Sequence, residues 1–172
     1  SLLDGSALQL AQQGGADGIV VNMKNDWGAL GWQSQQPLAS SLQSGISPQT
    51  VNDSLMAWNQ GELYTVARFS CFRDEALGSQ MEYTLRTSSN YRWRDQDDFH
   101  WSAPSNLTVQ DYLVNLMVEL AQLGFDEIVL DSWGYPSQAD GTLGNIQRGE
   151  NYPEGSLDSI TTAFLEKAAL AL

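Results

Sequence analysis

The residues best suited to chemistry lie at the ends of predicted strands. Asp131 directly follows the apolar run 128–130 and precedes the turn-forming, aromatic segment 132–136. In α/β folds, catalytic groups lie at the carboxyl ends of strands, where the loops converge. A carboxylate there can serve as a nucleophile or stabilise developing positive charge. The alternative for a strand-end aspartate is that it only caps the following turn.

Three more polar residues are expected to lie beside Asp131. Strand side chains alternate between two faces, and this alternation places Arg68 on one face of its strand and Asn22 with Lys24 on one face of another. Polar groups in parallel strands are costly to bury unless they pair. We therefore expect these side chains to converge with Asp131, and Arg68 to lie within salt-bridge reach of it. A purely structural ion pair is the alternative.

The loops after the predicted strands are rich in aromatic residues. These residues are Trp27, Trp32, Tyr91, Trp93, Trp101, Trp133, Tyr135 and Tyr152. Flat apolar faces beside polar groups are typical of sugar-binding clefts, although aromatic residues also fill cores and interfaces. We expect Trp101 or Trp133 to line an open cleft beside Asp131.

The sequence indicates neither a metal site nor a cofactor. His100 is the only histidine, which excludes a multi-histidine site. The acidic run 95–98 lacks the glycine and glutamate of an EF-hand loop, so a solvated turn is expected there. Cys71 is the only cysteine, and its place at the end of an apolar strand predicts a buried, inert thiol.

Composition restricts the class of partner. The chain has 172 residues, 42% of them hydrophobic, and carries 21 acidic against 8 basic residues for a net charge of -13. Such a charge repels phosphate backbones and anionic bilayers. No apolar run reaches the roughly 20 residues that span a membrane, and no signal-peptide pattern is present. We expect one domain over 1–172, with no nucleic-acid or membrane partner.

Helical and strand signals alternate along the chain. Helices are predicted over 3–13, from Ser47 to Gly61, from Thr108 to Gly124 and from Ser156 onward, and strands over 18–24, 63–69 and 128–130. This order predicts an α/β fold of parallel (β/α) units with right-handed crossovers. A full (β/α)8 barrel needs about 250 residues, so we expect a partial or truncated TIM-barrel-like domain.

The predicted barrel fragment has an open side. Unpaired strand edges and exposed apolar faces tend to become covered. We expect either that two copies form a homodimer that completes the barrel or that the long 70–107 loop covers the open side.

Four segments in order resemble a family of bacterial glycosyl hydrolase domains related to the α-amylase-type barrels. They are GADGIVVNMKNDWG, YTVARFSCFRDEAL, the region from Trp93 to Pro104, and VQDYL followed by LGFDEIVLDSWGYP. The match spans roughly residues 14–136. In that family the motifs are a strand ending in Lys and acids, an Ala-Arg strand followed by Phe-x-Asp, and a Gly-Phe-Asp-Glu turn into a strand ending in Asp.

The resemblance implies a carbohydrate-directed hydrolase. It favours Asp131, Arg68 and Asp26 as catalytic residues. The substrate-binding candidates are Lys24, Asn22, Trp27, Asp74, Trp101, Trp133 and Tyr135. Asp26, Asp74 and Glu150 are the candidates for a second carboxyl group, and a secreted or cell-surface location in a bacterium is expected.

Two departures from the family pattern keep a second interpretation open. The family follows its strand-end Asp with Tyr-x-Arg-Phe-Pro, whereas segment 132–136 lacks the arginine. Family members also continue through further strands that would carry the general acid. A non-catalytic carbohydrate-binding or scaffold domain on a degenerate half-barrel is therefore the alternative to a hydrolase.

Overall fold

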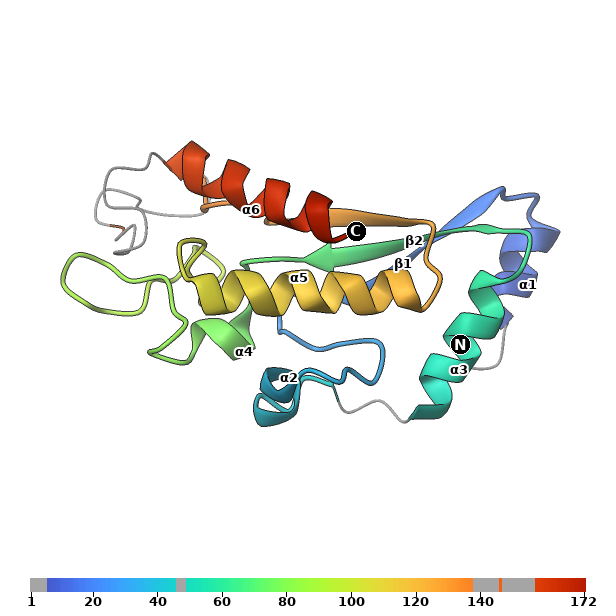
Figure 1. Ribbon diagram of the computed structural model, residues 1–172, viewed down its shortest axis with the longest axis horizontal. Coiled ribbons are helices and arrows are strands. Elements are labelled where there is room, and N and C mark those ends of the chain that lie inside the picture. Colours follow the sequence, from blue (N-terminus) through green and yellow to red (C-terminus); the bar gives the residue numbers. More distant parts are fainter. Residues whose placement is uncertain (1–5, 46–48, 138–145, 147–156) are drawn as a thin grey trace.

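A three-stranded parallel sheet forms the centre of the protein. The computed structural model describes residues 6–45, 49–137, 146 and 157–172. The strands are β1 (Gly18–Lys24), β2 (Tyr64–Ser70) and β3 (Glu127–Asp131), hydrogen-bonded in the order β1-β2-β3. All three predicted strands are confirmed, with boundaries shifted by one residue or so. Helices alternate with the strands in an α/β arrangement, and the sheet does not close into a barrel (Figure 1).

Six helices accompany the sheet in the described part of the chain. They are α1 (Ser6–Gln13), α2 (Pro37–Ser41), α3 (Gln49–Asn59), α4 (Glu75–Gly78), α5 (Leu107–Gln122) and α6 (Leu157–Ala171). The four predicted helices are among them. The short helices α2 and α4 lie where loops were expected. The predicted helix starts at Ser47 and Ser156 lie outside the described residues.

Helix α5 begins earlier than its sequence pattern suggests. Its N-cap is Asn106, whose side-chain oxygen accepts a hydrogen bond from the Val109 amide. The expectation that Thr108 opens this helix is therefore wrong. Asn106, two residues before Thr108, caps the helix by accepting a hydrogen bond from a free backbone N–H of the first turn. At the other end Gly124 has a φ of 89°, the left-handed conformation that glycine provides after a helix.

The core lies on one face of the sheet. Met23, Ala67 and Phe69 on this face are fully buried. Helix α5 contributes a stripe of fully buried apolar residues, and α6 packs beside α5 (Figure 1). Phe164 of α6 meets Phe72 edge to face, with 4.7 Å between ring centroids. Helices thus cover one side of the sheet, as in a (β/α) unit.

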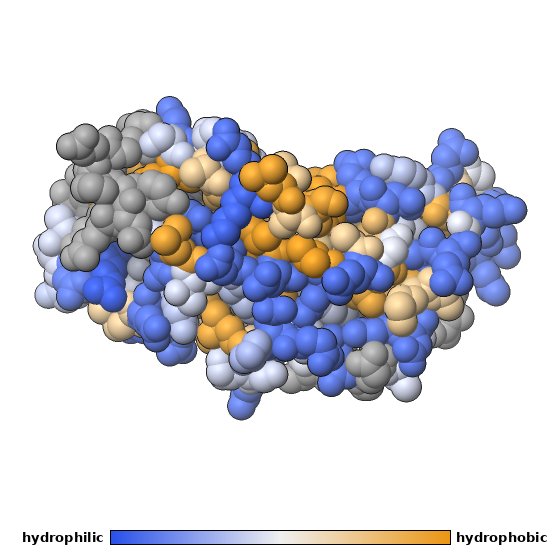
Figure 2. Space-filling view, viewed as in Figure 1, coloured by the Kyte–Doolittle hydropathy of each residue, from blue (hydrophilic) through white to orange (hydrophobic). Residues whose placement is uncertain are grey.

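The opposite face of the sheet is open. Val20, Tyr64 and Val129 are 63%, 49% and 39% exposed. Figure 2 shows further apolar surface over α6, where Leu170 and Leu172 near its end are exposed. A parallel sheet normally has both faces covered, so this exposed face is unusual for an α/β domain.

The long segment after β2 is ordered and folds beside the sheet. It contains α4 and antiparallel bridges that include Arg73–Trp101 and Thr84–Ser102. Trp93 and Trp101 are buried and meet edge to face. The expectation that this segment covers the open face of the sheet is wrong, because Val20 and Val129 remain exposed.

Among the described residues, no helix is both long and apolar enough to cross a bilayer.

Candidate functional site

A cleft of about 760 Å³ lies at the carboxyl edge of the sheet. The ends of β2 and β3, the loops that follow the strands, and the first turns of α6 form its walls. Its lining includes Asp26, Arg68, Arg73, Asp97, Asp131 and Trp133. Carboxylates, guanidinium groups and an aromatic ring therefore meet in one open space.

Arg68 and Asp131 form the ion pair that the strand alternation predicts. In the register of the sheet, Arg68 aligns with Val129, two residues before Asp131. The two side chains are diagonal neighbours on one face and can meet. Oδ2 of Asp131 is shielded from solvent and contacts Nε of Arg68 outside hydrogen-bonding geometry, so the contact is ionic. Both side chains remain partly exposed, at 46% and 37%.

The segment after Asp131 is held by the sheet and turns sharply. The carbonyl oxygens of Asp131 and Ser132 accept hydrogen bonds from the amides of Cys71 and Phe72, at 2.8 and 3.0 Å. Ser132 has a φ of 48°, a conformation that non-glycine residues rarely adopt. This turn brings Trp133, which is 46% exposed, into the cleft wall.

Lys24 does not join this cluster, and the expectation that it does is wrong. A β-bulge lies between Asn22 and Lys24, so that Asn22 aligns with Arg68 whereas Lys24 aligns with Phe69. The extra residue reverses the alternation and turns Lys24 into the core. Its Nζ atom lies 2.6 Å from Oδ2 of Asp74 and donates to the Ser70 carbonyl at 2.8 Å.

Asp74 is likewise structural rather than cleft-lining. It is 1% exposed, and its Oδ1 atom caps α4 by accepting from the Leu77 amide at 2.9 Å. Burial of the Lys24–Asp74 pair places both residues outside the cleft lining. Their predicted role in substrate binding is therefore not supported by their positions.

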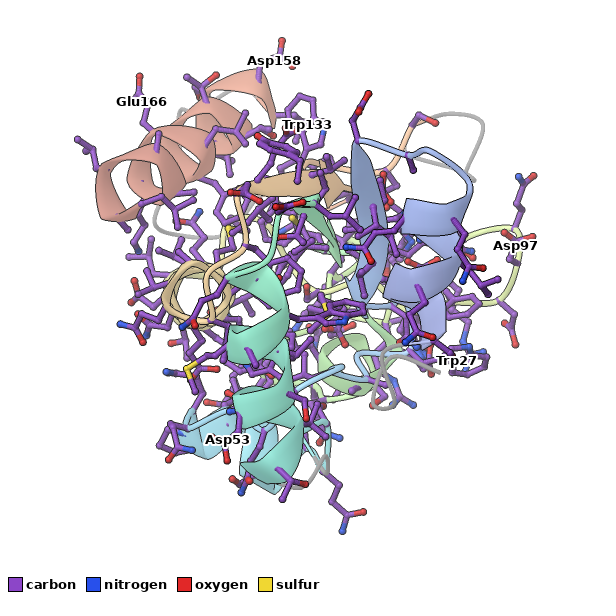
Figure 3. All side chains as sticks on the ribbon, turned by 90° about the vertical axis from the view of Figure 1, so that its right-hand side faces the viewer. Trp27, Asp53, Asp97, Trp133, Asp158 and Glu166 are labelled. Atoms are coloured by element: carbon purple, nitrogen blue, oxygen red, sulfur yellow. The ribbon has the colours of Figure 1, made fainter. Side chains whose placement is uncertain are left out.

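Two other predicted binding residues lie outside the cleft lining. Asn22 is on the open face of the sheet, aligned with Arg68. Trp27 is 65% exposed and packs against Phe99, with 4.7 Å between ring centroids. Figure 3 shows Trp27 on a different side of the molecule from Trp133.

The predicted aromatic lining is present. Trp101, Trp133 and Tyr135 all contribute to the cleft. Trp101 is 3% exposed and supports the wall from behind, whereas Trp133 offers a much more accessible ring. Trp32 and Trp93 belong to the core, and Tyr152 lies outside the described residues.

Arg73 organises one wall of the cleft and was not predicted. Its Nη1, Nε and Nη2 atoms lie 2.7, 2.7 and 2.8 Å from carboxylate oxygens of Asp26, Asp95 and Asp97. The guanidinium also stacks on Phe99, with Cζ 4.3 Å from the ring centroid. Arg73 thereby joins the loop after β1 to the loop after β2.

The charges of this cluster support each other. Burial opposes the ionised form of Asp95, but hydrogen bonds from Arg73 and Trp101 outweigh it and hold the pKa of Asp95 below its ordinary value. Burial likewise opposes the charge on Arg73, while its hydrogen bonds to Asp95 and Asp26 raise its pKa. The expected solvated turn at 95–98 is thus only half right: Asp97 and Asp98 are exposed, but Asp95 is buried.

Sequence reasoning also missed two aspartates that line the cleft. Asp97 lies in the acidic run interpreted as a solvated turn, and Asp158 lies in the first turn of α6. Arg73 occupies the variable position of the Phe-x-Asp motif at 72–74, so no sequence pattern singled it out. Glu150, a candidate second carboxyl group, lies outside the described residues.

Within the described ranges, no three His, Cys, Asp or Glu side chains are grouped as a metal site would require. Cys71 is a buried free thiol, as predicted. Burial raises its pKa to about 12, and a thiol that stays protonated is a poor nucleophile. Among the described residues, the carboxyl groups that line the cleft all belong to aspartates.

Comparisons with known proteins relate this chain to one family and one solved structure. A model of the family described as “putative glycosyl hydrolase domain” matches residues 3–172. The crystal structure of a hypothetical protein from Ruminiclostridium thermocellum ATCC 27405 superimposes with a TM-score of 0.81 at 25% identity, over 99% of this chain and 85% of that chain. No functionally curated protein matches the sequence.

Proposed function

This chain belongs to the family described as “putative glycosyl hydrolase domain”, and on that premise we propose that it acts on carbohydrate in the cleft beside Asp131. The observation that carries the proposal is the Arg68–Asp131 ion pair at the carboxyl end of adjacent parallel strands, in a cleft that also holds Trp133. The catalytic groups of (β/α)8 enzymes lie at the carboxyl ends of the strands.

The chemistry of glycoside hydrolysis gives Asp131 a role. Positive charge develops at the anomeric carbon in the transition state. A carboxylate in the cleft stabilises that charge or attacks the carbon. Arg68 orients Asp131 through their ion pair. Trp133 packs against the apolar face of the sugar ring.

We propose that the sheet is part of a (β/α) barrel. Its three parallel strands lie in sequence order, and within the described residues helices cover only the face that would point outward. Arg68, Asp131 and the exposed valines Val20 and Val129 would then point toward the barrel axis.

One observation favours a non-catalytic carbohydrate-binding domain instead. Hydrolysis needs a second carboxyl group that donates a proton. Asp26 and Asp97 are both paired with Arg73. Asp158 lies at the start of α6, where a helix stabilises negative charge. Two of the described cleft aspartates are therefore already engaged by Arg73.

The substitution Asp131→Asn distinguishes the two functions. A hydrolase releases reducing ends from members of an oligosaccharide panel, and the variant loses this activity by about 10²–10³-fold. Its folding should be unchanged by circular dichroism, because the Arg68–Asp131 pair is partly exposed. Binding without release of reducing ends, in both proteins, would assign the binding function. A protein that neither binds nor cleaves any glycan would refute both.

A further inference from the structure

Acidic groups outnumber basic groups in the cleft, and both basic groups are already occupied. Among the described residues, Asp26, Asp97, Asp131 and Asp158 line it, against Arg68 and Arg73. Arg68 contacts Asp131, and the three nitrogens of Arg73 each contact a different carboxylate. A ligand that enters this space therefore meets negative charge that the cleft itself does not neutralise.

Each contact of Arg73 with a cleft aspartate uses one carboxylate oxygen and leaves the second oxygen outside that contact. Asp26 and Asp97 each use Oδ2 for Arg73, so Oδ1 of each carboxylate is not used by that arginine. Asp97 is 66% exposed, and Figure 3 shows it projecting from its loop. Carboxylate oxygens only accept hydrogen bonds. They suit sugar hydroxyl or amino groups, which donate, and they repel a ligand carboxylate.

We propose that this cleft selects uncharged or amino-bearing sugars and rejects uronic acids and other anionic glycans. The inference deepens the proposed function and rests on it. Arg73 is the positioning residue. It holds Asp26 and Asp97 on one wall, and its own positive charge is neutralised by these ion pairs. Specificity against anionic sugars then arises from repulsion, a common way to exclude a competing ligand. The net charge of -13 on the whole chain acts in the same direction.

The test uses pairs of oligosaccharides that differ only in the C6 group. Galactose and galacturonate oligomers of equal length form one pair, and mannose and mannuronate oligomers form another. Glucosamine oligomers serve as the cationic probe. Titration calorimetry on the full chain at low salt should show each uronate binding at least about tenfold more weakly than its neutral partner. Added salt should reduce that difference, because it screens exposed charges.

A matched pair of variants assigns the effect to the cleft. Asp97→Asn removes one cleft charge and keeps an oxygen that can accept from Arg73. Asp98→Asn removes a neighbouring exposed charge that lies outside the cleft lining and pairs with Arg94. We expect Asp97→Asn to reduce the ratio of the uronate Kd to the neutral-sugar Kd by about threefold or more. Asp98→Asn should leave that ratio unchanged within error.

The outcomes separate this inference from the proposed function. A uronate oligomer that binds as tightly as its neutral partner would overturn the charge selection and leave carbohydrate recognition standing. Equal effects of the two variants would show that the overall charge, rather than the cleft, discriminates. If none of the oligomers binds, the selection and the proposed function both fail.

Discussion

The two ion pairs on neighbouring strands make very different contributions to stability. Lys24 and Asp74 are 0% and 2% exposed and lie 2.6 Å apart, whereas Arg68 and Asp131 are partly open to water. Removing one partner of a buried pair leaves an uncompensated charge in a medium that solvates it poorly. Removing one partner of an exposed pair lets water replace it.

Lys24→Met should therefore reduce the free energy of unfolding by about 3–5 kcal/mol, measured by urea denaturation. Arg68→Met is the control from the adjacent strand and should cost less than about 1 kcal/mol. Similar costs for the two variants would contradict the difference in burial between the two ion pairs.

Asp95 should make stability depend on pH in the acidic range. Its folded-state pKa is lowered by Arg73 and Trp101, despite burial. The corresponding stabilisation is complete above the ordinary aspartate pKa of about 3.9. It is lost as the pH falls below that value through the lower folded-state pKa.

Urea midpoints at pH 7 and pH 3 test this dependence. Asp95→Asn should lower stability at pH 7 and lose less on acidification than the parent protein, because the titrating group is gone. Asp98→Asn, at an exposed position in the same turn, should behave like the parent. If Asp95→Asn loses as much stability between pH 7 and pH 3 as the parent protein, Asp95 is not a main source of the pH dependence.

The start of α5 gives a prediction at the scale of a single element. Asn106 caps this helix, and its Nδ2 atom also donates to the Glu82 carbonyl at 3.0 Å. Asn106→Ala should cost about 1 kcal/mol or slightly more. Thr108→Ala, at the residue that the sequence pattern favoured as the start, should cost only a few tenths. A reversed order of the two thermal midpoints would restore the sequence-based boundary.

Elements were more predictable than the positions of individual side chains. The apolar periodicity of α5 and the β-branched runs of the strands are local signals, and these elements formed where predicted. The Arg68–Asp131 pair followed from alternation alone. The prediction for Lys24 was wrong because alternation assumes a regular strand, whereas the bulge after Asn22 turns Lys24 into the core, where it meets Asp74.

The Arg73 cluster was invisible for a related reason. It joins residues 26, 73, 95 and 97, whose proximity depends on how the long segment after β2 folds. No periodic pattern encodes that fold. A single arginine among many acidic residues in sequence carries no distance information, so this wall of the cleft could be found only in three dimensions.

At the scale of the whole molecule, the main unusual feature is that one face of the sheet is exposed to solvent. Val20, Tyr64 and Val129 are exposed on it. Within the described residues β1 and β3 are the edge strands, and the carboxyl end of β1 is bridged by Leu30. Parallel sheets are normally covered on both faces, and the segment after β2 packs elsewhere. A second copy is an occupant that can be tested directly, because the β3 edge of one chain can run parallel to the β1 edge of another.

We therefore expect the chain to form a dimer through this face. Analytical ultracentrifugation can measure the dissociation constant of that dimer. Val129→Lys places a charge in the interface and should shift the species to monomer, while circular dichroism stays unchanged because Val129 is already 39% exposed. Leu10→Lys is the control: Leu10 is 69% exposed but lies on α1, away from the sheet face. Any glycan cleavage that depends on the partner should fall on dilution in the parent and be lost in Val129→Lys. A parent protein that stays monomeric at high concentration would refute the dimer, as would a dimer that both variants leave intact.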